Sequence, residues 1–328
     1  MLYIRFKNGQ GLGNQLWLYA SSKSISEKLN TKLKIFDFEK FKGKGFLKLD
    51  NQIDLNLKYQ DLDLEKYNIK IFNERVFFDM RINYILSGYD ENVLKINSKT
   101  LLEGLFQSEK YFFNEINRVK RYIKLNESSI NKNKVNSDIC ILNIRGGEYK
   151  KYKNLILPFD YWTNGMKNFK NKYGIYKFKV VTDDYRYAKT LFPELEIIHG
   201  DVEKCYATIY NCSNIILSNS SFGYFPCKTG KRKRVIAPFY WARYKNKFNV
   251  WASPANIYKD WLWQDENSNL ISYEDSLKIA SYTEDYYKRE YTVLIDKVKV
   301  PFNYYSFIPK KIKIFLKKIL RNLLPKYF

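Results

Sequence analysis

Apolar residues along this chain follow two alternating patterns. Short, nearly continuous apolar runs are typical of strands that are buried on both faces of a sheet. Such runs occur at residues 2–6, 32–38, 101–106, 139–145, 176–184, 195–200, 214–220 and 234–238. Between them lie longer stretches with apolar side chains at helical spacing, as at residues 14–29. Because strands that alternate with helices pair in parallel, the pattern predicts an α/β fold.

One polar segment interrupts this alternation. Residues 126–138, NESSINKNKVNSD, are rich in asparagine and show no apolar periodicity, so we place a domain boundary there. The predicted organisation is an N-terminal α/β domain at residues 1–130, a second α/β domain at 131–268 and an extension at 269–328. Within this extension, the stretch at about 270–300 is expected to be helical.

Residues 309–328 predict a basic amphipathic helix. After Pro309, apolar residues recur at 312, 315, 316, 319, 320, 323 and 324. Six cations lie largely off that stripe: Lys310, Lys311, Lys313, Lys317, Lys318 and Arg321. Such a helix suits an anionic membrane surface, although the stripe also fits the protein's own core or a partner chain. No secretory signal and no apolar run of ~18 residues is recognised, so we expect a cytoplasmic protein, peripheral at the inner face of the cytoplasmic membrane.

Composition narrows the class of protein. The chain has 328 residues, 45% hydrophobic and 18% aromatic, which excludes a disordered chain. The formal net charge of +23 is compatible with nucleic acid binding, but the chain carries no RNA-binding signature and no helix-turn-helix pattern. The four cysteines (Cys140, Cys205, Cys212 and Cys227) lack metal-ligand spacing, and His199 is the only histidine. The sequence predicts no disulfide framework, zinc site or Ser-His-Asp triad, and it predicts that Cys140 and Cys212 are buried thiols.

Three short segments follow predicted strands at the position where open α/β sheets bind ligands. Gly9, Gly11 and Gly13 follow the first strand, and glycines at such a turn let the backbone approach a phosphate or a sugar. Arg145 ends another run, and its guanidinium can grip a pyrophosphate with two hydrogen bonds. Residues 219–222, Asn-Ser-Ser-Phe, offer hydroxyls and backbone amides. Each segment alone also fits a tight connection or a surface ion pair, but their joint occurrence in this order is more specific.

Six sequence blocks in this order resemble those of the bacterial α-1,2-fucosyltransferases, a family 11-like group of glycosyltransferases. The blocks are GLGNQLWLYA at 11–20, LLEGLFQSEKYF at 101–112, ILNIRGGEY at 141–149, VVTDDYRYAKTLFP at 180–193, NCSNIILSNSSFGYF at 211–225 and VIAP at 235–238. The resemblance extends over about residues 1–265. It implies two facing Rossmann-like domains, the GT-B arrangement, with the acceptor side in the first domain and the nucleotide-sugar donor in the second.

The donor motif departs from the pattern His-x-Arg-Arg-x-Asp of that family. The motif falls on residues 143–148, where Arg145 is retained, Asn143 replaces the histidine, glycine replaces the second arginine and Glu148 replaces the aspartate. These changes indicate either a different donor or a rebuilt way of holding the same one.

A second departure concerns the base of the nucleotide. In the family, an aspartate about fifteen residues before the Ser-Ser-Phe serines helps to read guanine, and Cys205 stands at this position. A thiol cannot supply both acceptors that a carboxylate offers to guanine. Asp201 or Glu203 takes over this role if the alignment shifts locally.

The resemblance implies a metal-independent reaction in which cations and helix N-termini neutralise the leaving diphosphate. The catalytic candidates are Arg145, Glu148 and Asn14. The donor-binding candidates are Gly11, Gly13, Asn143, Arg145, Asp183, Cys205, Ser220, Ser221 and Phe222. An inverting reaction also uses a base near the acceptor hydroxyl, for which Glu148, Asp183, Asp184 and Asp37 stay open. Asp183 and Asp184 equally fit the cap of the following helix.

These observations predict a glycosyltransferase that moves fucose or a related deoxy sugar from a nucleoside diphosphate to a glycan hydroxyl. The expected setting is synthesis of a bacterial surface polysaccharide such as O-antigen or capsule, with an oligosaccharide or lipid-linked glycan as acceptor. No cofactor, metal ion or nucleic acid partner is expected. Two alternatives remain: a transferase for another nucleotide-activated sugar, and a degenerate transferase-like module that has lost catalysis.

Overall fold

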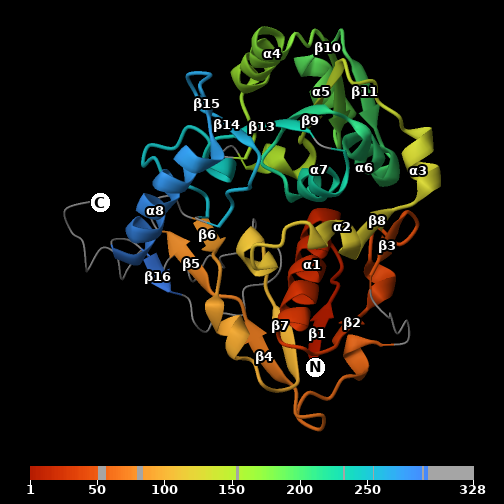
Figure 1. Ribbon diagram of the computed structural model, residues 1–328, viewed down its shortest axis with the longest axis vertical. Helices are drawn as coiled ribbons and strands as arrows, with labels where there is room; N and C mark the ends of the chain where they lie inside the picture. The colour runs from red at the N-terminus through yellow and green to blue at the C-terminus, as the bar shows by residue number, and fades with distance from the viewer. Residues whose placement is uncertain are drawn as a thin grey trace. The chain divides into compact units, whose positions relative to one another are not determined.

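Two sheets of parallel strands organise this protein, as seen in a computed structural model that describes residues 1–50, 57–79, 84–152, 155–231, 233–253, 255–289 and 292–294 (Figure 1). The first sheet has the strand order β2-β1-β7-β4, and all neighbours pair in parallel. Its strands are β1 (Leu2–Arg5), β2 (Leu33–Phe36), β4 (Lys70–Asn73) and β7 (Thr100–Glu103). The chain moves outward from β1 to β2, crosses to the far edge of the sheet at β4 and then enters β7, between β4 and β1.

The second sheet has seven strands in the order β11-β10-β9-β12-β13-β14-β15, and only β15 runs antiparallel to its neighbour. Its strands are β9 (Ile139–Ile144), β10 (Lys177–Thr182), β11 (Glu196–His199), β12 (Asn214–Leu217), β13 (Arg234–Pro238), β14 (Leu262–Gln264) and β15 (Leu270–Ile271). Every residue of β9 is buried, which explains its continuous apolar run.

Two small antiparallel sheets, eight α-helices and several short 3₁₀ helices complete the described elements. The small sheets pair β3 (Leu47–Leu49) with β8 (Ile123–Leu125), and β5 (Val76–Asp79) with β6 (Tyr84–Ser87) and β16 (Thr292–Leu294). The helices are α1 (Leu12–Lys28), α2 (Arg118–Tyr122), α3 (Glu127–Lys132), α4 (Phe159–Tyr173), α5 (Tyr185–Leu191), α6 (Val202–Asn211), α7 (Tyr224–Thr229) and α8 (Tyr273–Arg289).

Helix α1 is buried on all sides. It packs on β1 and β2 and also meets the short 3₁₀ helix η6 (Ser221–Gly223) and α7 (Figure 1). Trp17 is fully buried, with its ring 4.1 Å from that of Tyr224 and 5.8 Å from that of Tyr258. The hydroxyl of Ser21 donates a hydrogen bond of 2.8 Å to the Phe106 carbonyl. A helix that is enclosed in this way carries small and apolar residues around its whole circumference.

The α/β class and the strand positions predicted from the sequence are confirmed, as is the burial of the Cys140 and Cys212 thiols. The polar segment at 126–138 contains the short helix α3, and the division of the chain near residue 130 into two facing domains stays a prediction. The helical prediction for 270–300 holds over α8 but is wrong at Leu270–Ile271 and Thr292–Leu294, which are strands. These residues pair with β14 and β5, a long-range preference that local periodicity does not reveal.

The predicted amphipathic helix at 309–328 lies outside the described residues. Within the part of the chain that the structure describes, no helix has the length and apolar content to span a bilayer.

Candidate functional site

The chain reverses its direction of travel across the second sheet between β9 and β12. From β9 it proceeds to β10 and β11 on one side, and it then returns to β12 on the other side of β9. In open α/β sheets, ligands bind at such a switch point, beyond the carboxyl ends of the strands. The predicted residues 143–148 span the end of β9 and the loop after it, and the predicted residues 218–222 follow β12.

Arg145 is held at this edge by Asp183, which follows β10. Nη1 of Arg145 lies 3.1 Å from Oδ2 of Asp183, and the other oxygen of Asp183 accepts a hydrogen bond of 2.9 Å from the backbone N–H of Gly146. The guanidinium carbon of Arg145 also lies 5.5 Å from the centre of the Tyr149 ring. Asp183 therefore orients the guanidinium without using all its donors, because Nε of Arg145 is buried and makes no hydrogen bond with the described residues.

Three further buried polar atoms near this edge lack a partner among the described residues. They are Oδ1 of Asn143, Oγ of Ser218 and Oδ1 of Asn219. Asn143 and Leu217 are register partners on neighbouring strands, so the three residues lie at adjacent strand ends. Buried polar groups in folded proteins are nearly always hydrogen-bonded, to protein, water or a ligand. The unpaired atoms make this edge a candidate binding site for a polar ligand.

The Ser-Ser-Phe turn begins the 3₁₀ helix η6 and faces helix α1. The buried Ser220 hydroxyl accepts a 3.3 Å hydrogen bond from the Phe222 N–H, so it caps this turn. The Ser221 hydroxyl donates a hydrogen bond of 2.7 Å to Oδ1 of Asn14. The same oxygen of Asn14 accepts a hydrogen bond of 2.8 Å from Nε2 of Gln107. The structure thus brings Asn14 to the predicted donor loop.

Gly13 has a structural reason to lack a side chain. A Cβ atom at this position would lie 2.5 Å from the carbonyl carbon of Ser221 and 2.6 Å from the nitrogen of Phe222. Gly11 is exposed, and its missing side chain would meet nothing within 4 Å. Of these two predicted donor-binding glycines, Gly13 allows the close approach of two backbones, whereas Gly11 leaves the first turn of α1 open.

The loop after Arg145 leaves no room for the second arginine of the family pattern. A Cβ atom on Gly146 would lie 2.6 Å from Cβ of Asp184. Asp184 itself caps α5, accepting a hydrogen bond of 3.1 Å from the N–H of Tyr187. It also pairs with Lys150, and this hydrogen bond holds the pKa of Asp184 below its usual range. The capping role that the sequence left open for Asp184 is therefore confirmed.

Cys205 lies on α6 against the end of β10, where its thiol donates a 3.9 Å contact to the Thr182 carbonyl. Burial raises the pKa of Cys205 to about 11, so the thiol is neutral at pH 7. Asp201 caps α6 through the N–H of Glu203, at 2.9 Å, and Glu203 in turn accepts a hydrogen bond of 2.5 Å from the Ser129 hydroxyl on α3. Both alternative carboxylates for reading the base are thus engaged in holding α6.

Glu148 is exposed on the 3₁₀ helix η5 (Gly147–Lys151). Its carboxylate makes no hydrogen bond and no ion pair with the described residues. Over the described ranges, no group of three or more His, Cys, Asp or Glu side chains is placed to hold a metal ion.

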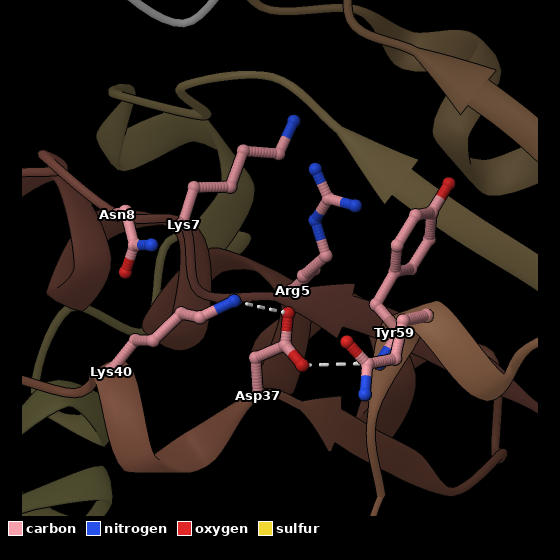
Figure 2. Close-up of a pocket in the computed structure, with 7 residues that line it drawn as sticks. Arg5, Lys7, Asn8, Asp37, Lys40 and Tyr59 are labelled. Carbon is pink, nitrogen blue, oxygen red and sulfur yellow. Dashed lines mark hydrogen bonds and ion pairs between the residues drawn. The ribbon is translucent and has the colours of Figure 1, made fainter.

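A second polar site lies at the carboxyl edge of the first sheet. A pocket of about 310 Å³ is lined by Arg5, Lys7, Asn8, Asp37, Lys40, Tyr59 and Gln60 (Figure 2). Asp37, a candidate base from the sequence, accepts hydrogen bonds from Nζ of Lys40 at 2.9 Å and from the N–H of Tyr59 at 3.1 Å. Burial alone would raise the pKa of Asp37, but these hydrogen bonds outweigh it and the pKa is lowered. A lowered pKa makes Asp37 a weak base at neutral pH.

Sequence reasoning missed the three cations of this pocket, Arg5, Lys7 and Lys40. Arg5 and Lys7 are two residues apart at the end of β1, and residues at this spacing point to the same side of a strand. That spacing was the available signal.

Comparison with known proteins identifies the family of this chain. The family model of glycosyl transferase family 11 matches residues 7–266. A search of curated proteins found no match. Among solved structures, the fucosyltransferase NodZ from Bradyrhizobium has 15% identity and a TM-score of 0.40, covering 69% of this chain and 92% of NodZ. A variant of Arabidopsis thaliana FUT1 in complex with GDP has 11% identity and a TM-score of 0.45, covering 74% of this chain and 71% of FUT1.

A family 9 glycosyl transferase from Veillonella parvula DSM 2008 has 10% identity and a TM-score of 0.45, covering 86% of this chain and 96% of that protein. The family assignment depends on the family model, which spans most of the chain and includes both strand-edge loops described above. The chain belongs to glycosyl transferase family 11 and is a glycosyltransferase.

Proposed function

We propose that this glycosyltransferase moves fucose, or a related deoxy sugar, from a nucleoside diphosphate to a hydroxyl of a glycan, with inversion and without a metal ion. The observation that carries the proposal is the group of unpaired polar atoms beside Arg145 at the switch point of the second sheet. A diphosphate there would accept hydrogen bonds from the donors of Arg145 that Asp183 does not use.

In the proposed reaction, Arg145 stabilises the negative charge that develops on the leaving diphosphate. Asp183 acts as a positioning residue, because it fixes the plane of the guanidinium from the neighbouring strand. The hydroxyl of Ser220 retains its own proton for a phosphate oxygen, since in the turn it serves only as an acceptor. Among the candidate bases, Glu148 lies closest to Arg145 in the sequence, and its carboxylate makes no hydrogen bond with the described residues. We therefore assign Glu148 the role of base.

A transferase for another nucleotide-activated sugar is the second candidate. It is favoured by the crowding at Gly146, which excludes the second arginine, and by the neutral thiol at Cys205. Both features weaken the expected grip on GDP-fucose, so we expect weak GDP binding or preference for another nucleotide.

A thermal-shift panel of GDP, UDP, CDP and their sugars tests both candidates, because a ligand that binds the native state raises the melting temperature. We expect at least one nucleotide sugar to raise it in a concentration-dependent way. A panel without any response contradicts the transferase proposal and favours a degenerate module.

The base-reading positions have their own test. Cys205→Asp combined with Asn143→His is expected to tighten GDP binding by roughly ten- to a hundredfold, since one hydrogen-bonded carboxylate contributes about 1–3 kcal/mol. Cys205→Ser is the matched control, because it restores no carboxylate. Unchanged GDP affinity in the double variant shows that these positions do not contact the base.

The cellular setting is proposed from the sequence. A basic amphipathic helix at residues 309–328 would hold the enzyme at the inner face of the cytoplasmic membrane, near a lipid-linked glycan of a bacterial surface polysaccharide. Deleting residues 309–328 is expected to abolish sedimentation with anionic vesicles while leaving donor binding unchanged. Loss of donor binding in the truncated chain would instead indicate a structural role for this segment.

A further inference from the structure

The pocket at the edge of the first sheet is connected to the candidate donor site by a short piece of chain. Arg5, Lys7 and Asn8 line the pocket, and the same loop continues into the first turn of α1. There, Asn14 contacts Ser221 of the donor loop. The loop that lines this pocket is therefore continuous with the helix turn that contacts the predicted donor loop, which makes the pocket a candidate site for the acceptor.

The Arg5 guanidinium is held in place and has hydrogen-bond donors available for an anion. Its guanidinium carbon lies 3.7 Å from the centre of the Tyr59 ring, so the ring holds one face of the guanidinium. Among the described residues, no carboxylate pairs with Arg5 and no hydrogen bond engages its nitrogens. Stacking on an aromatic ring leaves the in-plane N–H donors available for a planar carboxylate or a phosphate.

The other two cations of the pocket each pair with a carboxylate, whereas the positive charge of Arg5 has no carboxylate partner among the described residues. Lys7 pairs with Glu103 at the end of β7, and Lys40 pairs with Asp37. Figure 2 shows the tips of Arg5, Lys7 and Tyr59 extending to the same side, while Asp37 and Lys40 turn toward each other. The pocket thus combines a net positive group with amide and hydroxyl side chains, Asn8, Gln60 and Tyr59.

We propose that this pocket binds an acidic sugar unit of the acceptor, with the anionic group on Arg5 and the sugar hydroxyls on the neighbouring amides. This inference deepens the proposed function and rests on it. The volume of about 310 Å³ is at the lower end of the range for small-molecule sites, which suits one sugar unit. Carboxylate and phosphate share the chemistry that Arg5 recognises, so a uronic acid and a sugar phosphate are the two sources.

The test compares matched probes on the full chain. Methyl glucuronide and glucose phosphate supply the anionic group on a sugar, methyl glucoside supplies the neutral sugar, and inorganic phosphate supplies the anion alone. We expect the two acidic sugars to raise the melting temperature, with the tighter one identifying the source, and the other two probes to act at least tenfold more weakly. Equal affinity for methyl glucoside, or for inorganic phosphate, overturns the proposal.

Variants separate this pocket from general attraction to a chain of net charge +23. Arg5→Met is expected to raise the dissociation constant for the acidic sugar about tenfold or more, as loss of a charge-assisted hydrogen bond would. Arg75→Met removes an equal charge from an exposed position outside the pocket and is expected to change nothing. If Arg5→Met does not fold, Arg5→Lys keeps the charge without the fork, and we expect several-fold weaker binding.

Unchanged binding in the folded Arg5 variant overturns the proposal. The nucleotide panel, run on the same samples, is expected to respond equally in wild type and Arg5→Met. If no nucleotide or nucleotide sugar raises the melting temperature of the wild type, the proposed function is overturned. If acidic sugars bind the Arg5 variant as tightly as the wild type, only this inference is overturned.

Discussion

Oδ1 of Asn14 accepts a hydrogen bond of 2.7 Å from the hydroxyl of Ser221, a residue 207 positions further along the chain. This contact joins the glycine-rich loop after β1 to the Ser-Ser-Phe turn after β12. Two segments that the sequence marked separately as donor-site candidates are thus parts of one arrangement.

Substitutions of Asn14 separate the structural role of its side-chain oxygen from the proposed contact of its side-chain nitrogen with substrate. Asn14→Ala removes the acceptor for both Ser221 and Gln107, and we expect a loss of about 1–2 kcal/mol in the free energy of unfolding. Asn14→Asp keeps an acceptor oxygen and is expected to keep most of that stability.

The same aspartate variant tests contact with substrate. Nδ2 of Asn14 makes no hydrogen bond with the described residues, so Asn14→Asp replaces a donor that is available to a ligand by a negatively charged oxygen. We expect turnover to fall while stability is retained, as measured by denaturant unfolding and by initial rates. Full turnover in Asn14→Asp would restrict Asn14 to a structural role.

Gly13→Ala is expected to destabilise the protein by about 1–3 kcal/mol, because the new methyl group would meet the backbone of Ser221 and Phe222. Gly11→Ala is the matched control, since a methyl group there meets no atom within 4 Å, and the expected change is under about 1 kcal/mol. Thermal or denaturant unfolding of the two variants measures the difference. Equal stability of both would contradict the close approach of α1 to the Ser-Ser-Phe turn.

Arg145→Ala is expected to lower kcat/KM by roughly 10²–10³-fold with the fold intact, the usual cost of losing one group that stabilises developing charge. Its side chain is partly exposed and pairs only with Asp183 among the described carboxylates, so circular dichroism should stay unchanged. The exposed Arg75→Met again serves as control for charge. A folded Arg145→Ala protein with wild-type kinetics would exclude Arg145 from the donor site.

A buried carboxyl predicts a pH dependence of stability. Glu74 follows β4 and accepts hydrogen bonds from the N–H groups of Leu105 at 2.7 Å and Phe106 at 2.8 Å, and from the Tyr111 hydroxyl at 3.2 Å. Burial raises the pKa of Glu74 to about 7, and the three hydrogen bonds only partly oppose this. The folded chain therefore binds more protons than the unfolded chain between the ordinary pKa of 4.5 and pH 7.

It follows that this contribution to stability is fully present below about pH 4.5 and is lost as the pH rises through 7. Glu74→Gln keeps an acceptor for both N–H groups and does not titrate. We expect the stability of wild type minus that of Glu74→Gln to fall by about 3 kcal/mol from pH 4 to pH 8. A difference that is constant across this range, in urea unfolding, would contradict the raised pKa.

The sequence predicted the positions of strands more readily than it predicted which distant segments contact one another. The strand β9 was predictable because all six of its residues are buried, so its apolar run is unbroken. Helix α3 was not predictable, because its polar sequence is stabilised by residues distant in the chain. The Ser129 hydroxyl donates a hydrogen bond to Glu203, and Nδ2 of Asn211 donates one of 2.8 Å to the Ile130 carbonyl. Tertiary contacts of this kind override local preference.

For the candidate site as well, the sequence predicted single residues but not their partners. Arg145 could be placed at a strand end from its own neighbourhood, but its partner Asp183 lies after the adjacent strand and was indistinguishable from a helix cap. The crowding at Gly146 depends on Asp184, which no spacing in the sequence reveals. The excess positive charge of the Arg5 pocket depends on which cations find carboxylates, and only the folded chain decides that.

The enclosure of α1 has a consequence for the order of synthesis. Trp17 leaves the ribosome early, whereas its ring partners Tyr224 and Tyr258 follow more than two hundred residues later. At ~5–20 residues per second, this delay is roughly 10–40 s. During that time, apolar side chains of α1 stay exposed on the nascent chain, and they are a natural target for a chaperone. Expression of this enzyme should therefore depend on folding helpers more than its parallel sheets alone would require.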